Sequence, residues 1–366
     1  MTDVAAKLTR VRAYMKEHDL DAVVFSSRAN FAWLTCGGDN HVVAQSDSGQ
    51  AAVMVTARQV CVIADAIEGP RIEKEEPVNG FTLKTHPWTQ DLGEAVRKAV
   101  GSKKQAATDE PWRMDLPPLP GDFNHSVRAE LCPGDIRRYR QLGRDCAIAI
   151  ETVAQHMSVG DSGHVVEADL SRHLLVRGIQ PHVLLVGFDD RLRRSRHPIP
   201  SVNHLRHLAM LVVCGQRGGL IANLTRMVHF GPLSAELKAR HASVCKVEAT
   251  MWEATQPGRA WKDVFKAAQK AYKDEGFDKE WEQHHQGGPT GYAGRDFLVT
   301  PQEDRLIHNN QAVAWNPSIS GTKSEDTFIV NEEGRQVLTA CSKNWPVCKV
   351  RLPGGVMIER PDILVR

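Results

Sequence analysis

Apolar and polar residues recur with two different periods along the first hundred positions of this chain. Leu8, Val11 and Met15 lie at helical spacing and predict an amphipathic helix over 3–18. A second helix is predicted over 92–100, and the short apolar runs between the helices predict strands. These strands cover residues 21–25, 51–56, 59–64 and 81–85. Strands that alternate with helices are typical of an α/β layer.

A proline-rich stretch, 111–120, breaks this pattern and predicts irregular structure near the end of a first domain. Asp135 follows a Pro-Gly pair and is suited to cap a long helix with an apolar face from Tyr139 to Met157. We therefore expect two domains, an α/β domain over 1–132 and a second domain over 133–366, since 366 residues suit two ordinary domains.

The second domain combines paired helices with antiparallel strands, which favours an α+β architecture. Its helices are predicted at 164–177, 233–254 and 260–274, and its strands at 182–188, 208–213 and 219–227. The stretch 314–330 reads as a strand, a turn and a second strand, because an Asn-Pro pair and Gly321 precede a β-rich run. Such a hairpin would bring Asn316 and Glu325 close together.

Composition narrows the classes of function. The net charge is only +2, which argues against a general nucleic-acid or membrane-surface binder. No apolar run reaches the length of a membrane span, and the first residues lack the pattern of a signal peptide, so we expect a cytoplasmic protein. The eight cysteines contain no Cys-x-x-Cys pair, and we expect reduced thiols rather than a zinc knuckle.

Several motifs occur in the order found in one superfamily. They are Leu224-Thr225-Arg226, the Gly-rich His turn at 284–291, and Glu325-Asp326 followed by an aliphatic strand; the start of the long helix, 135–140, fits as well. The second domain resembles the pita-bread fold of the M24 peptidases, aminopeptidase P and creatinase. Together with the first domain, the resemblance to this superfamily covers about residues 1–345. It implies a creatinase-like N-terminal domain, a pita-bread catalytic-type domain and a homodimer in which Asn30, Phe31 and Trp33 are candidates to close the partner's site.

The resemblance also locates five positions that hold two divalent metals in the metallopeptidases of this superfamily. Here they fall on Val212, Asn223, Gly288, Asn316 and Glu325. Four of the five ligands are therefore absent, and a single carboxylate cannot offset the charge of about +4 that two divalent ions bring. We expect no metal and no other cofactor. His284 and His285 are adjacent, and on a strand their side chains would point to opposite faces.

Creatinase, a metal-free member of the superfamily, suggests which residues remain for chemistry. His197, in Arg-His-Pro, stands where the resemblance places a catalytic histidine, and an unperturbed histidine titrates near pH ~6.5. Arg295 resembles the arginine that holds the substrate carboxylate, and it suits a bidentate grip. Glu325, in a cavity with Asn223 and Asn316, is expected to have a raised pKa and to carry a proton or hold a cationic substrate.

The predicted catalytic residues are thus His197, Glu325 and His285. The predicted substrate-binding residues are Arg295, Tyr292, Asn223, Asn316, His229 and His284. Each has a plain structural alternative, such as a loop histidine, a salt bridge or a buried polar residue. Cys214 is either a nucleophile with His197 as its base or an inert buried thiol.

Three functions remain open. The first is a metal-independent, creatinase-like hydrolase that cleaves a C–N bond in a small, carboxylate-bearing or peptide-like substrate. The second is an inactive pseudo-peptidase that serves as a binding protein. The third is a biosynthetic enzyme that uses the same pocket for a non-hydrolytic reaction. A retained polar cavity favours an enzyme, because buried unused polar groups cost stability.

Overall fold

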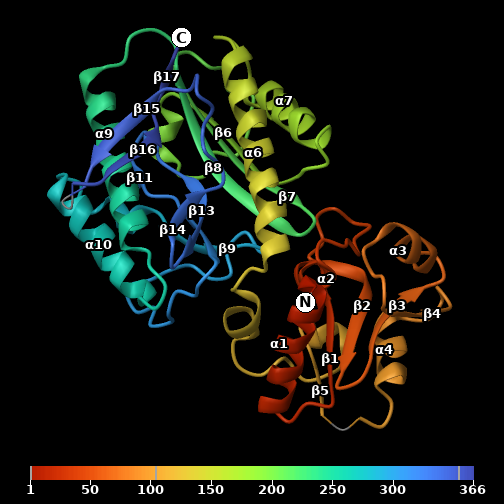
Figure 1. Ribbon diagram of the computed structural model, residues 1–366. Coiled ribbons are helices and arrows are strands. Elements are labelled where there is room, and N and C mark those ends of the chain that lie inside the picture. The colour runs from red at the N-terminus through yellow and green to blue at the C-terminus, as the bar shows by residue number, and fades with distance from the viewer. Residues whose placement is uncertain (1, 104, 353–354) are drawn as a thin grey trace. The chain divides into compact units, whose positions relative to one another are not determined.

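The computed structural model describes residues 2–103, 105–352 and 355–366, and the chain forms two compact units (Figure 1). The N-terminal unit consists of Met1–Ile136 with Gly218–Leu220, and the C-terminal unit consists of Arg137–Arg217 with Ile221–Arg366. None of the helices in these ranges is long and apolar enough to cross a membrane.

The N-terminal unit is built on a mixed five-stranded sheet in the order β4-β3-β2-β1-β5. The strands are β1 (Ala22–Ser27), β2 (Ser48–Thr56), β3 (Val60–Asp65), β4 (Thr82–His86) and β5 (Ala106–Thr108), and the helices are α1 (Asp3–Glu17), α2 (Arg28–Thr35), α3 (Gly69–Glu75), α4 (Leu92–Val100) and α5 (Pro111–Met114). Apolar residues of β1 to β3 pack against α4 in one core. Asp91 caps α4 by accepting hydrogen bonds from the backbone N–H groups of Gly93 and Glu94.

Two expectations for this unit need correction. The proline-rich stretch contains the one-turn helix α5, because Pro111 occupies its first turn, where a proline costs no hydrogen bond. Phe31 and Trp33 are fully buried in α2, and Asn30 donates to Asp109 and accepts from Arg128. These three residues belong to the core of their own unit, so they are not free to reach a partner's site.

The C-terminal unit contains two four-stranded sheets, ordered β17-β8-β7-β6 and β14-β13-β10-β9. The strands are β6 (Gln180–Phe188), β7 (Leu208–Arg217), β8 (Leu220–His229), β9 (Gly287–Thr290), β10 (Gln311–Trp315), β13 (Asp326–Asn331), β14 (Gly334–Val337) and β17 (Leu364–Val365). Two hairpins add β11 (Ser318–Ile319) with β12 (Thr322–Lys323) and β15 (Val347–Arg351) with β16 (Met357–Pro361). The sheets meet at β8, where Thr225 N donates to Glu325 O.

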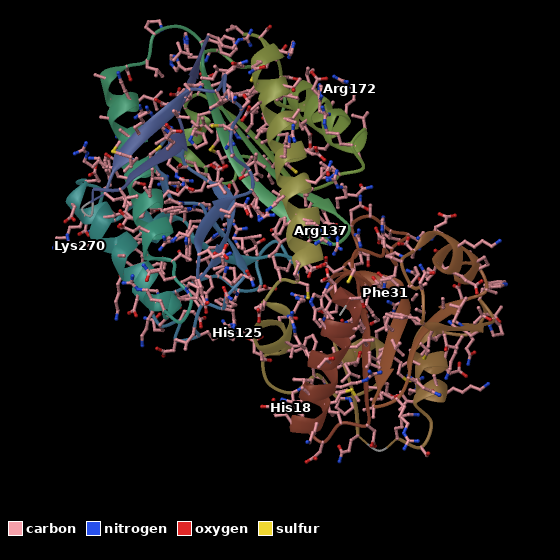
Figure 2. All side chains as sticks on the ribbon, in the orientation of Figure 1. His18, Phe31, His125, Arg137, Arg172 and Lys270 are labelled. Atoms are coloured by element: carbon pink, nitrogen blue, oxygen red, sulfur yellow. The ribbon has the colours of Figure 1, made fainter. Side chains whose placement is uncertain are left out.

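Helices cover these sheets (Figure 1). They are α6 (Pro133–His156), α7 (Gly163–Leu175), α8 (Arg191–Arg194), α9 (Ala235–Ala254) and α10 (Trp261–Asp274). Trp261 of α10 and Trp315 of β10 lie in one apolar cluster that joins α9 and α10 to the second sheet. Lys270 lies on the exposed side of α10 (Figure 2).

A buried ionic network lies behind the strand pair that the sequence predicts as a hairpin. The pairing of Trp315 with Asp326 confirms that hairpin, and the segment that connects its two strands forms the small β11–β12 hairpin. Arg226 of β8 contacts Glu151 of α6 at 3.3 Å and Asp326 at 3.1 Å, and all three are buried. Because every member is hydrogen-bonded, this network fixes β8 against β13 and so places the residue before Asp326, which is Glu325.

Candidate active site

A cavity of about 400 Å³ opens in the C-terminal unit beside β8 and the start of β13. Its polar lining comes from strands β6, β7, β8 and β12 and from loops that connect other elements. The lining residues that matter below are His197, Asn223, His285, Arg295, Asn316, Lys323 and Glu325, together with the apolar Val183, Leu185, Ile199 and Val212. Six of the nine predicted site residues therefore surround one cavity, although they lie as much as 128 positions apart in the sequence.

Glu325 is the centre of the polar lining. Its Oε1 accepts from Arg295 Nη2 at 3.1 Å, and its Oε2 accepts from Lys323 Nζ at 2.8 Å and Thr225 Oγ1 at 2.7 Å. Burial alone would raise the pKa of this carboxyl, but Lys323 and Arg295 outweigh burial and lower the pKa to about 2. The expectation of a raised pKa is wrong, since the sequence did not reveal the second cation. A carboxylate this acidic does not carry a proton at neutral pH.

Lys323 is the charged residue of the cavity lining that the sequence analysis missed, and His182 of β6 is a further polar residue of the lining that it did not name. Its side chain is 3% exposed and lines the cavity, whereas a lysine in a turn is normally solvated. One signal was available: Lys323 and Glu325 are two positions apart, and in extended backbone such residues share a face. Two cations and one carboxylate line the cavity, so it has one excess positive charge when its histidines are neutral. An anionic ligand would balance that charge.

Two asparagines place unsatisfied acceptors in the same cavity. Asn223 donates from Nδ2 to Thr290 Oγ1 at 3.0 Å, and it is fully buried. Within the described chain, Asn223 Oδ1 and Asn316 Oδ1 have no hydrogen-bond donor, and both are buried. Such groups are normally satisfied, because an orphaned buried acceptor costs about 1–3 kcal/mol. The two oxygens therefore suit N–H groups of a ligand.

Three histidines lie together at one side of the cavity. The rings of His284 and His285 are 4.6 Å apart, and those of His197 and His284 are 4.9 Å apart. The expectation that adjacent histidines point to opposite faces is wrong, because His284 and His285 precede β9 and do not belong to a strand. His197 and His285 line the cavity, whereas His284 is buried behind His197 and does not line it.

The surroundings keep these imidazoles neutral. Burial, followed by Arg295 and Lys323, lowers the pKa of His285 to about 4. Burial and Lys323 also lower the pKa values of His197 and His284. The ring nitrogens of the three lie close enough to share a metal ion, within 4.8 Å of one another. However, the same cations that disfavour imidazolium also repel a metal ion, and the single carboxylate nearby is already paired.

The residues present do not fit the dimetal centre that the superfamily implies. Val212 offers no ligand atom, and Glu325 already accepts from two cations and a hydroxyl. Gly288 has φ +153°, and a Cβ there would lie 2.7 Å from Phe297 O, so the backbone itself has no room for a histidine. Only two amide oxygens remain, and they carry no charge to offset two divalent ions.

Three predicted residues lie elsewhere than expected. Tyr292 is buried outside the cavity lining, and its hydroxyl accepts from Arg138 Nη2 at 2.9 Å. His229 lies at the end of β8 beside a different hollow, where it contacts Gly231 O at 2.9 Å. His284, as described above, contacts His197 instead of the cavity. The motifs around these three residues lead to segments near the cavity, but they do not determine in which direction each side chain points.

Cys214 lines the cavity but is poorly suited to attack a substrate. Burial and the charge of Glu325 raise the pKa of its thiol to about 12. The thiol is therefore protonated at neutral pH, and no hydrogen bond joins it to His197 in the described part of the chain. Since the thiolate is the nucleophilic form, the interpretation as an inert thiol is favoured.

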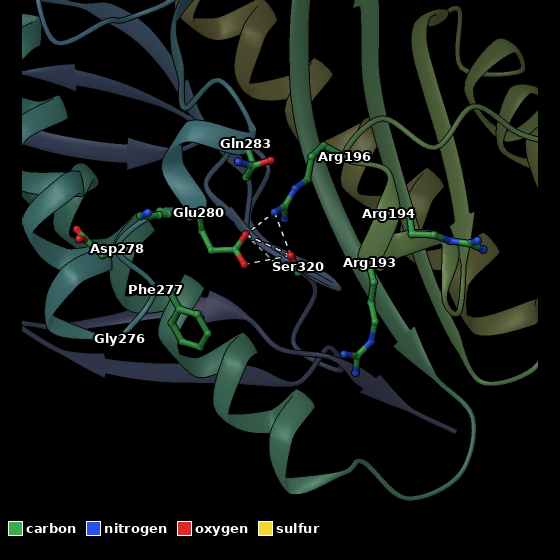
Figure 3. A pocket seen from close by; sticks show the side chains of 10 residues that line it. Arg193, Arg194, Arg196, Gly276, Phe277, Asp278, Glu280, Gln283 and Ser320 are labelled. Carbon is green, nitrogen blue, oxygen red and sulfur yellow. Dashed lines mark hydrogen bonds and ion pairs between the residues drawn. The ribbon is translucent and has the colours of Figure 1, made fainter.

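A second, more polar hollow of about 650 Å³ lies between the segments 193–196 and 276–283 (Figure 3). Arg193, Arg194 and Arg196 line it, so the basic run of the sequence forms the rim of a pocket. Arg196 forms an ion pair with Glu280, and Glu280 also accepts from Ser320 Oγ at 3.0 Å. This network lies next to His197 in the sequence and supports the loop that carries it.

Comparisons with known proteins agree with this architecture. Residues 137–365 match the model of metallopeptidase family M24, and residues 7–132 match the creatinase/prolidase N-terminal domain. The curated relatives include an uncharacterized peptidase of Staphylococcus epidermidis, which is 26% identical over 132 residues. That alignment covers 33% of this chain and 36% of the relative, so the chain matches only about a third of the relative's length.

Solved structures share the fold over nearly the whole chain. An Xaa-Pro dipeptidase from Bacillus anthracis has a TM-score of 0.77 and 15% identity, covering 99% of this chain and 100% of its own. A prolidase from Pyrococcus horikoshii OT3 has a TM-score of 0.78 and 14% identity, covering 93% and 99%. At such identities the likeness shows the two-domain pita-bread fold alone. The family model covers more than half of the sequence, and the chain belongs to metallopeptidase family M24.

Proposed function

We propose that this protein is a metal-independent hydrolase that cleaves a C–N bond in a small molecule carrying a carboxylate. The observation that carries the proposal is the arrangement around Glu325, where Lys323 and Arg295 leave one excess positive charge in a cavity of about 400 Å³. A cavity of this size suits a small molecule. A substrate carboxylate would supply the missing negative charge.

Arg295 is the anchor that we propose for this carboxylate. Its Nη2 donates to Glu325 and its Nη1 donates to Gly294 O at 2.6 Å, while its buried Nε has no acceptor in the residues described. Arginine suits carboxylate recognition because its donors form a rigid planar fork. The oxygens of Asn223 and Asn316 would accept from substrate N–H groups. A substrate with a carboxylate and an amide, amine or guanidinium group fits both requirements.

The hydrolysis needs one proton carrier. A water molecule adds to the carbon of the C–N bond and loses a proton to a neutral imidazole of His285 or His197; the imidazolium then protonates the leaving nitrogen as the C–N bond breaks. Glu325 is excluded from this role by its low pKa. Binding of the substrate carboxylate beside Arg295 and Lys323 offsets the positive field, which raises the basicity of the nearby histidines.

The names of the relatives support the hydrolytic part of the proposal. The curated relatives are named as uncharacterized peptidases, and the two solved structures described above are a dipeptidase and a prolidase, which are hydrolases of C–N bonds. The metal-independent part rests on the ligand positions of this chain, where a single carboxylate remains. We favour a hydrolase over an inactive binding protein or a non-hydrolytic biosynthetic enzyme, because the cavity is open and retains buried polar groups.

The test is elemental analysis of the purified protein, combined with a thermal-shift and hydrolysis screen before and after chelation. The screen uses guanidino acids, N-acyl amino acids and Xaa-Pro dipeptides, with their carboxamides as matched controls. We expect substoichiometric metal, binding of carboxylates in preference to the carboxamides, and turnover that is insensitive to chelation. Stoichiometric metal whose removal abolishes turnover would overturn metal independence. Equal binding of carboxylates and carboxamides would overturn the proposed substrate class.

A further inference from the structure

His284 is a buried titratable group to which the proposed reaction gives no task. It is 8% exposed, and it lies between the cavity residue His197 and Ser318 of β11. Its Nε2 is 3.1 Å from His197 Nε2, and its Nδ1 is 3.1 Å from Ser318 Oγ. Both distances are hydrogen-bond distances, so both nitrogens of His284 are used within the protein.

The direction of these two hydrogen bonds follows from the inventory of donors and acceptors. Ser318 is 3% exposed, and its hydroxyl has one proton to donate. Within the described residues, the contacts of this hydroxyl oxygen are His284 Nδ1 and Arg196 Nη1, and the arginine can only donate. Of these two contacts, only His284 Nδ1 can accept the proton of the Ser318 hydroxyl. A buried hydroxyl that is left without an acceptor costs free energy.

Arg196 favours the same direction. Its Nη1 lies 3.5 Å from Ser318 Oγ, and its guanidinium is held in place by the ion pair with Glu280. A fixed positive charge on one side of a hydroxyl turns the oxygen toward itself and the proton away, which here means toward His284. The same charge disfavours a second proton on His284, so His284 is neutral and carries its proton on Nε2.

We propose that His284 is a positioning residue that holds His197 in the tautomer with its proton on Nδ1. If Ser318 donates to His284 Nδ1, then His284 Nε2 donates, and His197 Nε2 must accept. The remaining nitrogen of His197, Nδ1, then carries the proton and is the one without a partner in the described chain. His197 therefore offers an N–H donor to a cavity ligand.

This assignment gives His197 and His285 different tasks, and in that respect it rests on the proposed function. A neutral imidazole does not give up its only proton, but it can donate a hydrogen bond to a substrate oxygen on which negative charge develops. His197 therefore stabilises that oxygen, and His285 carries the proton from the attacking water to the leaving nitrogen. His285 suits this role because its buried Nδ1 has no hydrogen-bond partner in the described residues.

The test is ¹⁵N NMR of the imidazole nitrogens in the full-length protein labelled at histidine, recorded at neutral pH without a ligand. Signals are assigned with His197→Gln and His284→Gln variants. We expect a protonated Nδ1 and an unprotonated Nε2 for His197, and the reverse for His284. The opposite tautomer of either ring overturns the proposal. Because the measurement needs no substrate, its outcome is independent of whether the chain hydrolyses any compound.

Ser318→Ala and Ser320→Ala form a matched pair for the same spectra. Ser320 contacts Arg196 and Glu280, as Ser318 contacts Arg196, but it has no hydrogen bond to His284. Ser318→Ala should reduce the tautomer ratios of His284 and His197 by roughly 2- to 10-fold, the equilibrium factor of one net hydrogen bond. Ser320→Ala should leave them unchanged. Equal effects of the two variants, or none from Ser318→Ala, would show that Ser318 does not set the tautomer.

Discussion

Lys323 Nζ lies 2.8 Å from Glu325 Oε2, and both side chains are at least 97% buried. The residue between them, Ser324, points to the other side and donates to Glu248. The alternation of extended backbone thus aims a cation and a carboxylate into one cavity and a serine into the core. A fixed ammonium group therefore neutralises the one carboxylate that remains at the site.

Replacing Lys323 by Met should destabilise the protein by about 3 kcal/mol, because Glu325 would stay buried with one cationic partner fewer. Urea unfolding at pH 7 measures the change. Lys349→Met is the control, since Lys349 and Glu359 form an exposed pair 3.8 Å apart, and its loss should cost less than about 1 kcal/mol. Equal losses for the two variants would contradict the structural role assigned to Lys323.

The stability contributed by Glu325 should disappear in acid. Its pKa is about 2 in the folded chain against an ordinary value of 4.5, so the contribution is complete above pH 4.5 and is lost as the pH falls toward 2. The shift corresponds to roughly 3 kcal/mol. Urea unfolding between pH 3 and pH 6 should give a smaller pH dependence for Lys323→Met than for the wild type. Parallel curves would mean that Lys323 does not lower this pKa.

Glu248 should produce the opposite pH dependence. Burial raises its pKa from 4.5 to about 7 despite the nearby Arg360. A carboxyl with a raised pKa in the folded state stabilises the protein while protonated, so its contribution decreases as the pH rises from 4.5 to 7, by about 3 kcal/mol in total. Glu248→Gln should remove this decrease, whereas Glu359→Gln, at an exposed position, should retain it. Comparison of unfolding free energies at pH 5 and pH 7 provides the measurement.

Arg295→Gln should weaken the binding of a carboxylate ligand by roughly 10- to 100-fold, the effect of losing a charged hydrogen bond of about 1.5–3 kcal/mol. Calorimetric titration with the carboxylate selected by the thermal-shift screen measures this. Arg217→Gln is the matched control, because Arg217 pairs with Asp145 at 2.7 Å and does not line the cavity. Unchanged affinity of Arg295→Gln for the ligand would show that Arg295 is not the anchor of its carboxylate.

The sequence determined the class of fold and much of the site. Helical periodicity predicted α1 and α4, because each of these helices buries one apolar face. Short apolar runs predicted most strands, because strands such as β1, β8 and β10 are buried on both faces. Ordered motifs identified the superfamily and the equivalent ligand positions, and six of the predicted residues surround the cavity. These predictions succeeded where a local pattern or a motif order carries the information.

Only the tertiary structure decided the electrostatics. The pKa of Glu325 depends on Lys323 and Arg295, and Arg295 lies 30 positions away, so no local pattern reveals the sum of charges in the cavity. The direction of the His284 ring depends likewise on Ser318 of β11 and on His197, which are far from each other in the sequence. The effects of burial and neighbouring charges on a pKa depend on which groups are close in space, not on which are close along the chain. For that reason the chemistry of the site could be derived only from the folded structure.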